Sequence, residues 1–393
     1  MKILVLSFYY RPDLSAGSFR ATALVRALKA SAPDVEIQVV TTLPNRYRSF
    51  TVDMPAAETA DGISIRRIAL PPHRSGMLDQ SKAFLSFARA ACRMVRSEKY
   101  DFIFATSSRL MTATLGAWIA WRKKTPLYLD IRDIFVDTIK DVLRPSLAMV
   151  ARPVFGVLER WTIRRAQRVN LVSGGFRDYF ESRYPGMRFS YFTNGIDDEF
   201  LAVAPPRASD TKPAHPLVAV YAGNLGEGQG LHLILPELAK RTLGTVHFRV
   251  FGDGGKRNQL LQAIECVGAS NVEVCSPIPR ERLIEEYARA DILFLHLNNL
   301  EAFKKVLPSK VFEYGALGKP IWAGVPGFSA DFIRSEINNA AVFPPCDAAA
   351  AVAALSALTI ETRPRPGFVE KYSRAAICRS MAEDILRTAN EPC

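Results

Sequence analysis

Three polar side chains follow one another closely near the start of a mostly apolar stretch, PSKVFEYGALGKPIWA, which covers residues 308–323. They are Ser309, Lys310 and Glu313. The Pro-Ser-Lys start is typical of a helix N-terminus, and Gly-Lys-Pro at 318–320 is typical of a helix end before a short strand. A glutamate one turn into such a helix has two possible uses. It caps free N–H groups at the helix start together with Ser309, or it faces a ligand.

Two turns that contain glycine also follow predicted strands. Gly17 lies between the first strand and the next helix, and Gly252 lies in FGDGG, residues 251–255. A strand, a glycine turn and a helix bring backbone N–H groups close to a phosphate or a sugar, although an ordinary turn has the same pattern. Neither turn is a complete GxGxxG fingerprint with its acidic partner, which disfavours a nicotinamide-dependent dehydrogenase.

A further candidate is Asp133 in LDIRDIF, at the end of a predicted strand. Its carboxylate would accept the proton of an attacking hydroxyl group or orient that group. Alternatively, Arg132 and Asp133 form a structural ion pair, or Asp133 caps the next helix. A metal site has little support, because none of the five histidines forms a spaced ligand pair, and His296 follows a buried strand as a core residue would.

The secondary structure that positions these residues can be predicted from the sequence. Short apolar runs, which are typical of strands, alternate along the chain with segments of helical periodicity. Strands are predicted at 2–8, 36–42, 100–106, 126–131 and 168–173, with helices near 18–30, 78–97, 110–122, 146–166 and 175–183. After residue 216 the alternation resumes, with strands near 217–223, 245–252, 271–275, 291–297, 320–323 and 340–343 and helices near 229–241, 256–266, 280–289, 309–317 and 347–358. This order predicts two doubly wound, mostly parallel α/β sheets.

The expected domain organisation follows from a break in this pattern. Residues 205–216 are rich in proline and read as a linker between an N-terminal domain, 1–204, and a C-terminal domain, 217–366. The tail, 367–393, is expected to form an amphipathic helix that packs back on the first domain. Two Rossmann-like domains of this kind would face each other across a cleft in which ligands bind.

Charge is unevenly distributed along the chain. Residues 1–205 carry 30 Lys and Arg against 19 Asp and Glu, whereas the rest carries 21 against 20. The first half therefore favours an anionic surface or substrate, and segments 83–99 and 144–168 would lie against anionic lipid or form a basic solvent face.

The N-terminus reads as a strand rather than a signal peptide, and the apolar run 110–121 is too short to span a bilayer. With six scattered cysteines, a cytoplasmic protein is predicted.

Seven strings in order give the chain a resemblance to family 4 glycosyltransferases, which have the GT-B fold. They are LDIRDIF, LERWTIRRAQRVNLVSGGFRDYF, FTNGIDDEF, YAGNLGEGQG, FGDGGKRNQL, SPIPRERLIEEYARADILFL and LPSKVFEYGALGKPI. The chain looks most like bacterial enzymes of surface polysaccharide synthesis that transfer N-acetylfucosamine-type sugars. The resemblance implies a retaining transferase that moves a sugar from a nucleotide-diphosphate donor, a UDP-sugar, to a lipid-linked acceptor.

The resemblance also implies roles for individual residues. Glu313 would accept hydrogen bonds from the ribose hydroxyls of the donor, and the helix start would support the diphosphate. Hydrogen bonds to a charged group contribute about 1.5–3 kcal/mol each, and a helix N-terminus carries roughly half a positive charge. The catalytic residues expected are Asp133, Lys310 and Glu313. The donor-binding residues expected are Gly17, Arg20, Asn224, Gln229, Gly252, Ile278, Pro308, Ser309, Lys310 and Glu313.

Two departures from the family pattern concern the donor. Lys305 stands where many members have a second glutamate, and Glu301 is four residues out of register. Asn224 and Gln229 replace the usual Arg/Lys pair of the diphosphate loop. Lys310, Arg20 and backbone amides are therefore expected to supply the positive charge.

Neither a cofactor nor a metal is expected, and peripheral attachment to the inner face of the cell membrane is a possibility. The enzymatic alternative is a sugar-nucleotide epimerase or hydrolase on the same fold, which would need no acceptor. A nucleic-acid-binding protein would also explain the basic half, but the sequence contains no recognised module of that kind, so nucleic acid is not an expected partner.

Overall fold

A computed structural model describes residues 1–13, 15–44, 54–60, 62–71, 77–107, 110–134, 136, 145–201 and 216–391. The chain divides into two compact units, one made of Met1–Asn194 and Arg374–Cys393 and the other of Gly195–Ser373. The expected boundaries at 204 and 367 are therefore displaced. The reason is local, because Ile196 pairs with Ser373 and its N–H donates to the Tyr372 carbonyl within the second unit. The predicted linker lies almost entirely outside the described residues.

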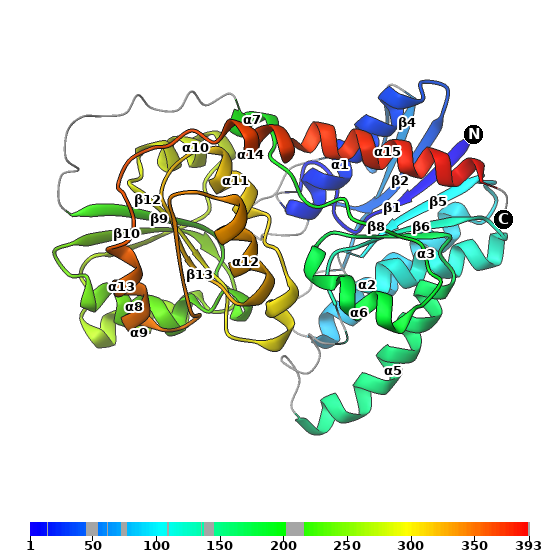
Figure 1. The fold of residues 1–393 in the computed structure, drawn as a ribbon. Helices are drawn as coiled ribbons and strands as arrows, with labels where there is room; N and C mark the ends of the chain where they lie inside the picture. Colours follow the sequence, from blue (N-terminus) through cyan, green and yellow to red (C-terminus); the bar gives the residue numbers. More distant parts are fainter. Residues whose placement is uncertain are drawn as a thin grey trace. The chain divides into compact units, whose positions relative to one another are not determined.

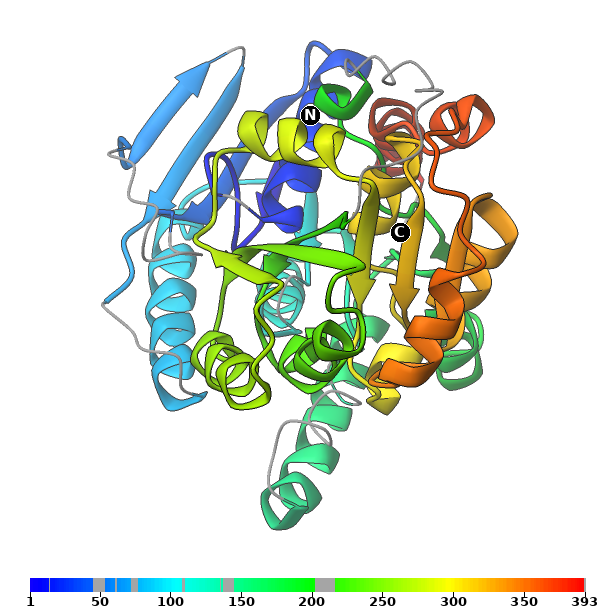
Figure 2. The same cartoon turned by 90° about the vertical axis from the view of Figure 1, so that its left-hand side faces the viewer.

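The first unit contains an eight-stranded sheet in the order β3-β4-β2-β1-β5-β6-β7-β8 (Figure 1). Neighbouring strands are parallel except β3 and β4, an antiparallel pair at the edge of the sheet (Figure 2, light blue). The sequence pattern misses β3, β4 and β8 and predicts the others. The strands are β1 (Lys2–Leu6), β2 (Glu36–Thr42), β3 (Ala57–Ala60), β4 (Ile63–Ile68), β5 (Phe102–Thr106), β6 (Leu127–Ile131), β7 (Arg168–Leu171) and β8 (Phe189–Ser190).

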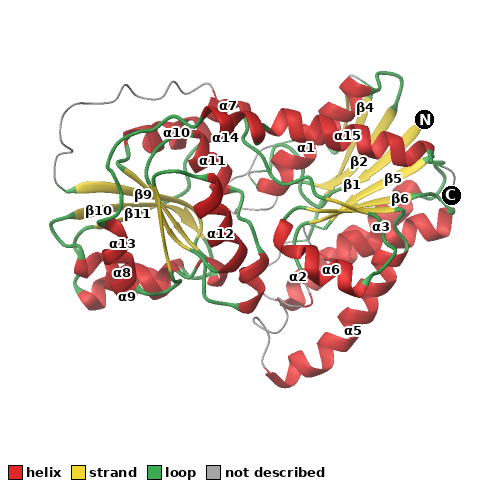
Figure 3. Cartoon of the chain, in the orientation of Figure 1, coloured by secondary structure: helices red, strands yellow, loops and turns green. Residues whose placement is uncertain are grey.

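Helices cover both faces of this sheet (Figure 3). One face carries α1 (Ala16–Ser31) and α15 (Arg374–Asn390), whose apolar side chains share one core with β1, β2 and β5. The other face carries α2 (Met77–Val95), α3 (Leu110–Lys123), α5 (Pro145–Arg164), the short 3-10 helix η1 (Gly174–Phe176) and α6 (Arg177–Arg183). The predicted core helix at 110–121 is α3, and no helix of the described chain is long and apolar enough to cross a bilayer.

The C-terminal helix α15 belongs to the first unit, and a buried carboxylate on it, Asp384, anchors it there. Asp384 accepts hydrogen bonds from the Tyr128 hydroxyl (2.9 Å), the Ser190 hydroxyl (2.8 Å) and Arg168 (2.7 Å). The single helix expected over the tail is instead two helices, because α14 (Pro366–Lys371) belongs to the second unit and the chain changes unit at Ser373.

The second unit contains a six-stranded parallel sheet in the order β11-β10-β9-β12-β13-β14. Every end of the observed strands lies within one residue of the predicted end. The strands are β9 (Leu217–Asn224), β10 (Val246–Asp253), β11 (Val272–Cys275), β12 (Ile292–His296), β13 (Ile321–Gly324) and β14 (Ala340–Phe343). The predicted fold class of two doubly wound α/β domains is thus confirmed.

The helices of the second unit again lie on two faces of the sheet. The apolar faces of α8 (Leu231–Arg241), α9 (Arg257–Val267) and α13 (Ala348–Leu355) pack with the aromatic rings of Phe248, Phe294 and Trp322. The remaining helices are α7 (Asp198–Leu201), α10 (Arg280–Arg289), α11 (Lys310–Ala316), α12 (Gly327–Glu336), α14 and the 3-10 helices η2 (Glu227–Gln229) and η3 (Glu301–Lys305). The sequence pattern does not predict α12.

Candidate functional site

The candidate site of the second unit lies where the winding of its sheet reverses. From β9 the chain proceeds through α8 to β10 on one side, whereas β12 pairs with β9 on the other side. Parallel sheets bind ligands beyond the carboxyl ends of their strands at such a switch point. Here those ends are Gly223-Asn224 on β9 and His296 on β12.

Glycines leave the backbone bare at this edge. Gly252 on β10 pairs in register with Gly223 on β9, and a Cβ at Gly252 would lie only 2.0 Å from the Gly223 carbonyl oxygen. Gly223 itself has φ +147°, and a Cβ there would lie 2.6 Å from Lys310 Cε and 2.9 Å from its Nζ. The Lys310 ammonium therefore lies directly against the end of β9, and the backbone conformation of Gly223 is one that favours glycine.

Lys310 and Glu313 are oppositely charged side chains one turn apart at the start of α11. Both side chains are half-buried, and no hydrogen bond or ion pair of either is found among the described residues. Burial lowers the pKa of Lys310, while the charge of Glu313 opposes that shift and Arg280 adds to it. The Ser309 side chain makes no capping hydrogen bond. Capping therefore does not explain Glu313, and its carboxylate oxygens are available to a ligand.

A second cation, Arg280 at the start of α10, lies close enough to Lys310 and Glu313 to influence their charges. Burial would lower its pKa, but Asp197, Glu313 and Glu199 together raise it. Its guanidinium is hydrogen-bonded to Asp197 and stacks over the Phe200 ring at 4.9 Å. Arg280 is thus held by the second unit itself. The sequence analysis did not single it out, although it stands in the SPIPRERL string.

The loop after β9 is held by side chains from two directions. Asn224 Nδ2 donates to Gln229 Oε1 at 2.8 Å, so the two residues in place of the usual Arg/Lys pair bind each other. Asn298 Nδ2 donates to the Glu227 carbonyl at 2.9 Å, and His296 Nδ1 lies 2.6 Å from the Gln229 carbonyl. The neutral pair, His296 at the end of β12 and Asn298 just after it fix the loop beside Gly223.

The other predicted donor-binding residues of this unit lie along the same edge. Ile278 is half-buried in the connection that follows β11, and Pro308 and Ser309 are half-buried immediately before α11. The edge therefore presents an apolar side chain after β11, a bare glycine backbone on β10 and β9, and the Lys310–Glu313 pair on α11, which follows β12. Such a surface suits a ligand with a flat apolar part, hydroxyl groups and a negative charge.

The structure does not support Arg20 as a donor ligand. Its side chain is 2% exposed, and its Nε and one terminal nitrogen each donate to Asp130 at 3.0 Å. The same guanidinium also donates to the Thr193 and Phe192 carbonyls. We therefore assign Arg20 to the core of the first unit, where all three of its nitrogens are used.

Gly17 and Asp133 lie at the carboxyl edge of the first sheet. Gly17 is buried at the start of α1, and the preceding Ala16 carbonyl is 3.5 Å from an Arg132 nitrogen. Asp133 is exposed in the segment after β6. Burial lowers the pKa of Arg132 to about 10, and Asp130 and Asp133 oppose that shift. Both the electrostatic pairing with Arg132 and a substrate role for Asp133 fit this geometry.

In the described part of the chain, no three His, Cys, Asp or Glu side chains come together as metal ligands.

Two family models match the chain in succession. Residues 17–195 match the glycosyl transferase 4-like domain, and residues 206–374 match the glycosyl transferases group 1 domain. The chain belongs to the glycosyltransferases. No curated protein matches it in sequence.

Solved structures resemble the glycosyltransferase over its whole length. Sucrose-phosphate synthase from Thermosynechococcus elongatus has a TM-score of 0.73 at 15% identity, with 98% of each chain covered. HepE from Anabaena, in complex with UDP and glucose, has a TM-score of 0.61 at 16% identity, covering 99% of this chain and 97% of HepE. WaaG, a glycosyltransferase involved in lipopolysaccharide biosynthesis, has a TM-score of 0.61 at 15% identity, with 99% of each chain covered. These likenesses show the GT-B fold.

His296 of the glycosyltransferase is a satisfied core residue, as its place after a buried strand predicts. Its Nε2 accepts from the Cys346 N–H at 2.9 Å, so Nδ1 carries the proton that goes to the Gln229 carbonyl. Burial lowers the pKa of His296 to about 4, against the hydrogen bond to Gln229, which raises it. A second proton on Nε2 would face the Cys346 N–H and break this arrangement.

The pH dependence of stability tests this role. In the unfolded chain the pKa of this histidine has its ordinary value of 6.5, whereas in the folded protein it lies near 4. The contribution of His296 is therefore complete above pH 6.5 and is lost as the pH falls toward 4, by up to about 1.4 kcal/mol per pH unit. Urea unfolding at a series of pH values should show wild-type stability falling more steeply than that of His296→Gln in this window. Parallel profiles would contradict the assignment.

Proposed function

We propose that this glycosyltransferase moves a sugar from a UDP-sugar to a lipid-linked saccharide, with retention of the anomeric configuration, in surface polysaccharide synthesis. The observation that carries the donor half of the proposal is the Lys310–Glu313 pair, unpartnered in the described structure, at the switch point of a group 1 domain. Three further parts of the proposal rest on the sequence resemblance: the retaining mechanism, the N-acetylfucosamine-type donor sugar and the lipid-linked acceptor.

Glu313 would bind the ribose of the donor. A carboxylate accepts hydrogen bonds from two adjacent hydroxyl groups, and such charge-assisted bonds are about twice as strong as neutral ones. HepE, which shares the fold, has been solved in complex with UDP and glucose, and this supports a uridine donor. The bare backbone at Gly223 and Gly252 allows the donor to approach the strand ends closely.

Lys310 would supply the positive charge for the diphosphate. Among the described cations near this edge, Arg280 is paired with Asp197 and Lys256 with Glu227 at 2.8 Å. Lys310 has no such partner in the described structure, and its Nζ lies against Gly223. A fixed charge aimed at the departing diphosphate lowers the barrier without a metal, because it needs no reorganisation during the reaction. The neutral Asn224–Gln229 pair would leave this task to Lys310 and backbone N–H groups.

On the acceptor side, Asp133 is the residue proposed to orient the attacking hydroxyl group. It is exposed at the carboxyl edge of the first sheet, directly after Arg132. Such a carboxylate holds a hydroxyl proton as the oxygen attacks the sugar.

The direct test is a panel of nucleotide-sugars, first screened for thermal stabilisation and then assayed for transfer. A ligand present at about a hundred times its Kd stabilises the folded protein by about 2.7 kcal/mol. We expect UDP-sugars to stabilise the protein and UDP to be released only when a polyprenyl-diphosphate-linked saccharide is added. Consumption of the donor at the same rate without the acceptor would instead identify an epimerase or a hydrolase. Stabilisation by no nucleotide would overturn the donor site.

A further inference from the structure

The outer surface of α2, α3 and α5, which we call the three-helix face, exposes two tryptophans. Trp118 and Trp121 lie one turn apart near the end of α3, are 45% and 44% exposed, and have ring centroids 5.0 Å apart. Most of the rest of α3 is buried, apart from its basic end at Arg122 and Lys123. Two large indole rings on the exposed side of a core helix form an apolar patch that the donor site does not explain.

The exposed charged side chains that the structure describes on the three-helix face are all positive. On or directly after these helices, among the described residues, no aspartate or glutamate is exposed. Glu159 is buried and accepts hydrogen bonds from the Tyr179 and Tyr184 hydroxyls, and Asp79 is half-buried. The exposed cations are Lys82, Arg89, Arg93, Arg96, Arg122, Lys124, Arg152, Arg160, Arg164 and Arg165.

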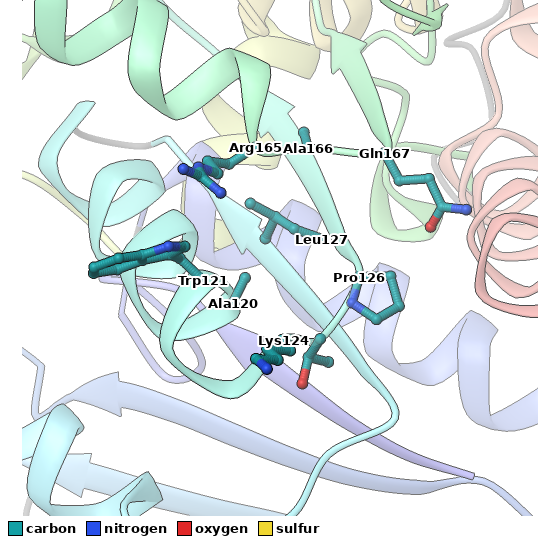
Figure 4. A pocket seen from close by; sticks show the side chains of 9 residues that line it. Ala120, Trp121, Lys124, Pro126, Leu127, Arg165, Ala166 and Gln167 are labelled. Atoms are coloured by element: carbon teal, nitrogen blue, oxygen red, sulfur yellow. The ribbon is translucent and has the colours of Figure 1, made fainter. Parts of the chain in front are cut away.

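Two hollows flank the tryptophans, each with cations in its wall. One, of about 390 Å³, lies beside Trp121 and is lined by Lys124, Arg165 and Gln167 (Figure 4). The other, of about 470 Å³, lies between α2 and α3 and is lined by Trp118, Arg96 and Arg122, among others. Both have room for a phosphate group.

The cations beside Trp121 are held in specific conformations. Arg165 lies between Trp121 and Trp161, with its guanidinium carbon 5.9 and 5.8 Å from the two ring centroids. Lys124, directly after α3, has φ 52°, a left-handed conformation that favours glycine. No ion pair of Lys124, Arg122 or Arg165 is found among the described residues. Because no described carboxylate pairs with them, these cations are open to an anion from outside the protein.

We propose that the three-helix face docks on a bilayer of anionic phospholipid, with Trp118 and Trp121 at the level of the head groups. Tryptophan concentrates at this level of membranes, and basic side chains are attracted to anionic lipid. The exposed Leu85, Met149, Val154 and Val157 of α2 and α5 extend the apolar surface. The first part of α5 projects beyond the other helices of its unit (Figures 1 and 2).

Two other occupants fit this face less well. Aliphatic side chains gain nothing from a solvated polynucleotide, and a second copy of the chain would bring two strongly basic surfaces together. The inference rests on the lipid-linked acceptor of the proposed function, because such an acceptor is reached at a membrane surface. It adds the end of α3 to the two segments, 83–99 and 144–168, that the sequence suggests as membrane candidates.

The experiment is co-sedimentation of the full chain with vesicles of phosphatidylcholine, with and without phosphatidylglycerol. We expect binding to the anionic vesicles at low salt, and Trp118→Ala/Trp121→Ala to weaken it by about tenfold or more. Brominated phosphatidylglycerol should quench the fluorescence of the wild type but much less that of the double variant. Arg122→Glu/Lys124→Glu should weaken binding by at least a similar factor, since two attractive charges become repulsive.

Matched variants in the second unit control for lost apolar area and changed charge. Leu233→Ala/Leu243→Ala removes two exposed leucines, and Lys240→Glu/Arg282→Glu makes the same charge change. Both should bind vesicles like the wild type, and all variants should keep the wild-type melting temperature. Stabilisation by UDP, measured on the same samples, separates the two proposals: lost vesicle binding with intact UDP binding affects only the docking face.

Several results would overturn the docking surface. They are absence of wild-type binding to anionic vesicles at low salt, equal binding by the tryptophan variant, and concentration-dependent self-association that the tryptophan variant abolishes. Tighter binding of the same face to polynucleotide than to anionic vesicles at one salt concentration would assign it to nucleic acid instead.

Discussion

Glu313→Gln should weaken UDP binding roughly tenfold to a hundredfold, because one hydrogen bond to a charged group contributes about 1.5–3 kcal/mol. The carboxylate makes no hydrogen bond among the described residues, so the protein itself loses little when it becomes an amide. We expect the free energy of unfolding to change by less than about 1 kcal/mol. Calorimetric titration with UDP and a thermal melt of the same sample measure the two quantities.

Glu265→Gln is the matched control for this substitution. Glu265 lies exposed on α9, so the variant makes the same charge change in the same unit away from the strand ends. It should bind UDP like the wild type. If Glu313→Gln bound UDP normally but melted many degrees lower, the glutamate would be a structural residue and the donor site would have to be sought elsewhere.

Much of the second unit can be predicted from the sequence, because its strands are short apolar runs bounded by turn residues. β9 and β12 read as nearly continuous apolar strands and β10 as an alternating one, and parallel strands of a doubly wound sheet must place their carboxyl ends at one edge. Gly223, Gly252 and Lys310 therefore come together as the pattern requires. What the pattern cannot show is that Lys310 touches Gly223, since that contact depends on how α11 packs.

The first unit shows where local patterns fail. β3 contains a single β-branched residue, Thr59, in AETA, so it carries little strand signal and forms only by pairing with β4. The α3 segment reads as a core helix, and periodicity alone does not reveal that Trp118 and Trp121 point outward. Both features are set by which neighbour an element packs against, and the neighbours are distant in sequence.

Arg20 illustrates the same limit for the candidate site. A basic residue in the first helix after a glycine turn fits a phosphate ligand, and nothing nearby in the sequence indicates otherwise. Its partner, Asp130, is 110 residues away at the end of β6. Burial alone would raise the pKa of Asp130, but Arg20 and then Arg132 and Asn170 outweigh it and hold that pKa below its ordinary value.

Arg20→Ala should therefore destabilise the first unit by about 3–5 kcal/mol, because it leaves a buried carboxylate without its counter-charge. The Thr193 and Phe192 carbonyls lose donors at the same time. Asp130→Asn should be destabilising for the converse reason. Arg20→Met/Asp130→Leu should be less destabilised than either single variant, since an apolar pair leaves no unpaired charge. Urea unfolding of the purified variants measures all three.

Arg334→Ala provides the control, because Arg334 and Asp331 form an exposed ion pair of the kind that contributes about 0–1 kcal/mol. The decisive comparison joins stability with UDP binding at a temperature where every variant is folded. A core residue loses stability and keeps UDP affinity, whereas a diphosphate ligand does the reverse. Normal unfolding of Arg20→Ala together with weakened UDP binding would therefore return Arg20 to the donor site and leave the burial of its ion pair with Asp130 unexplained.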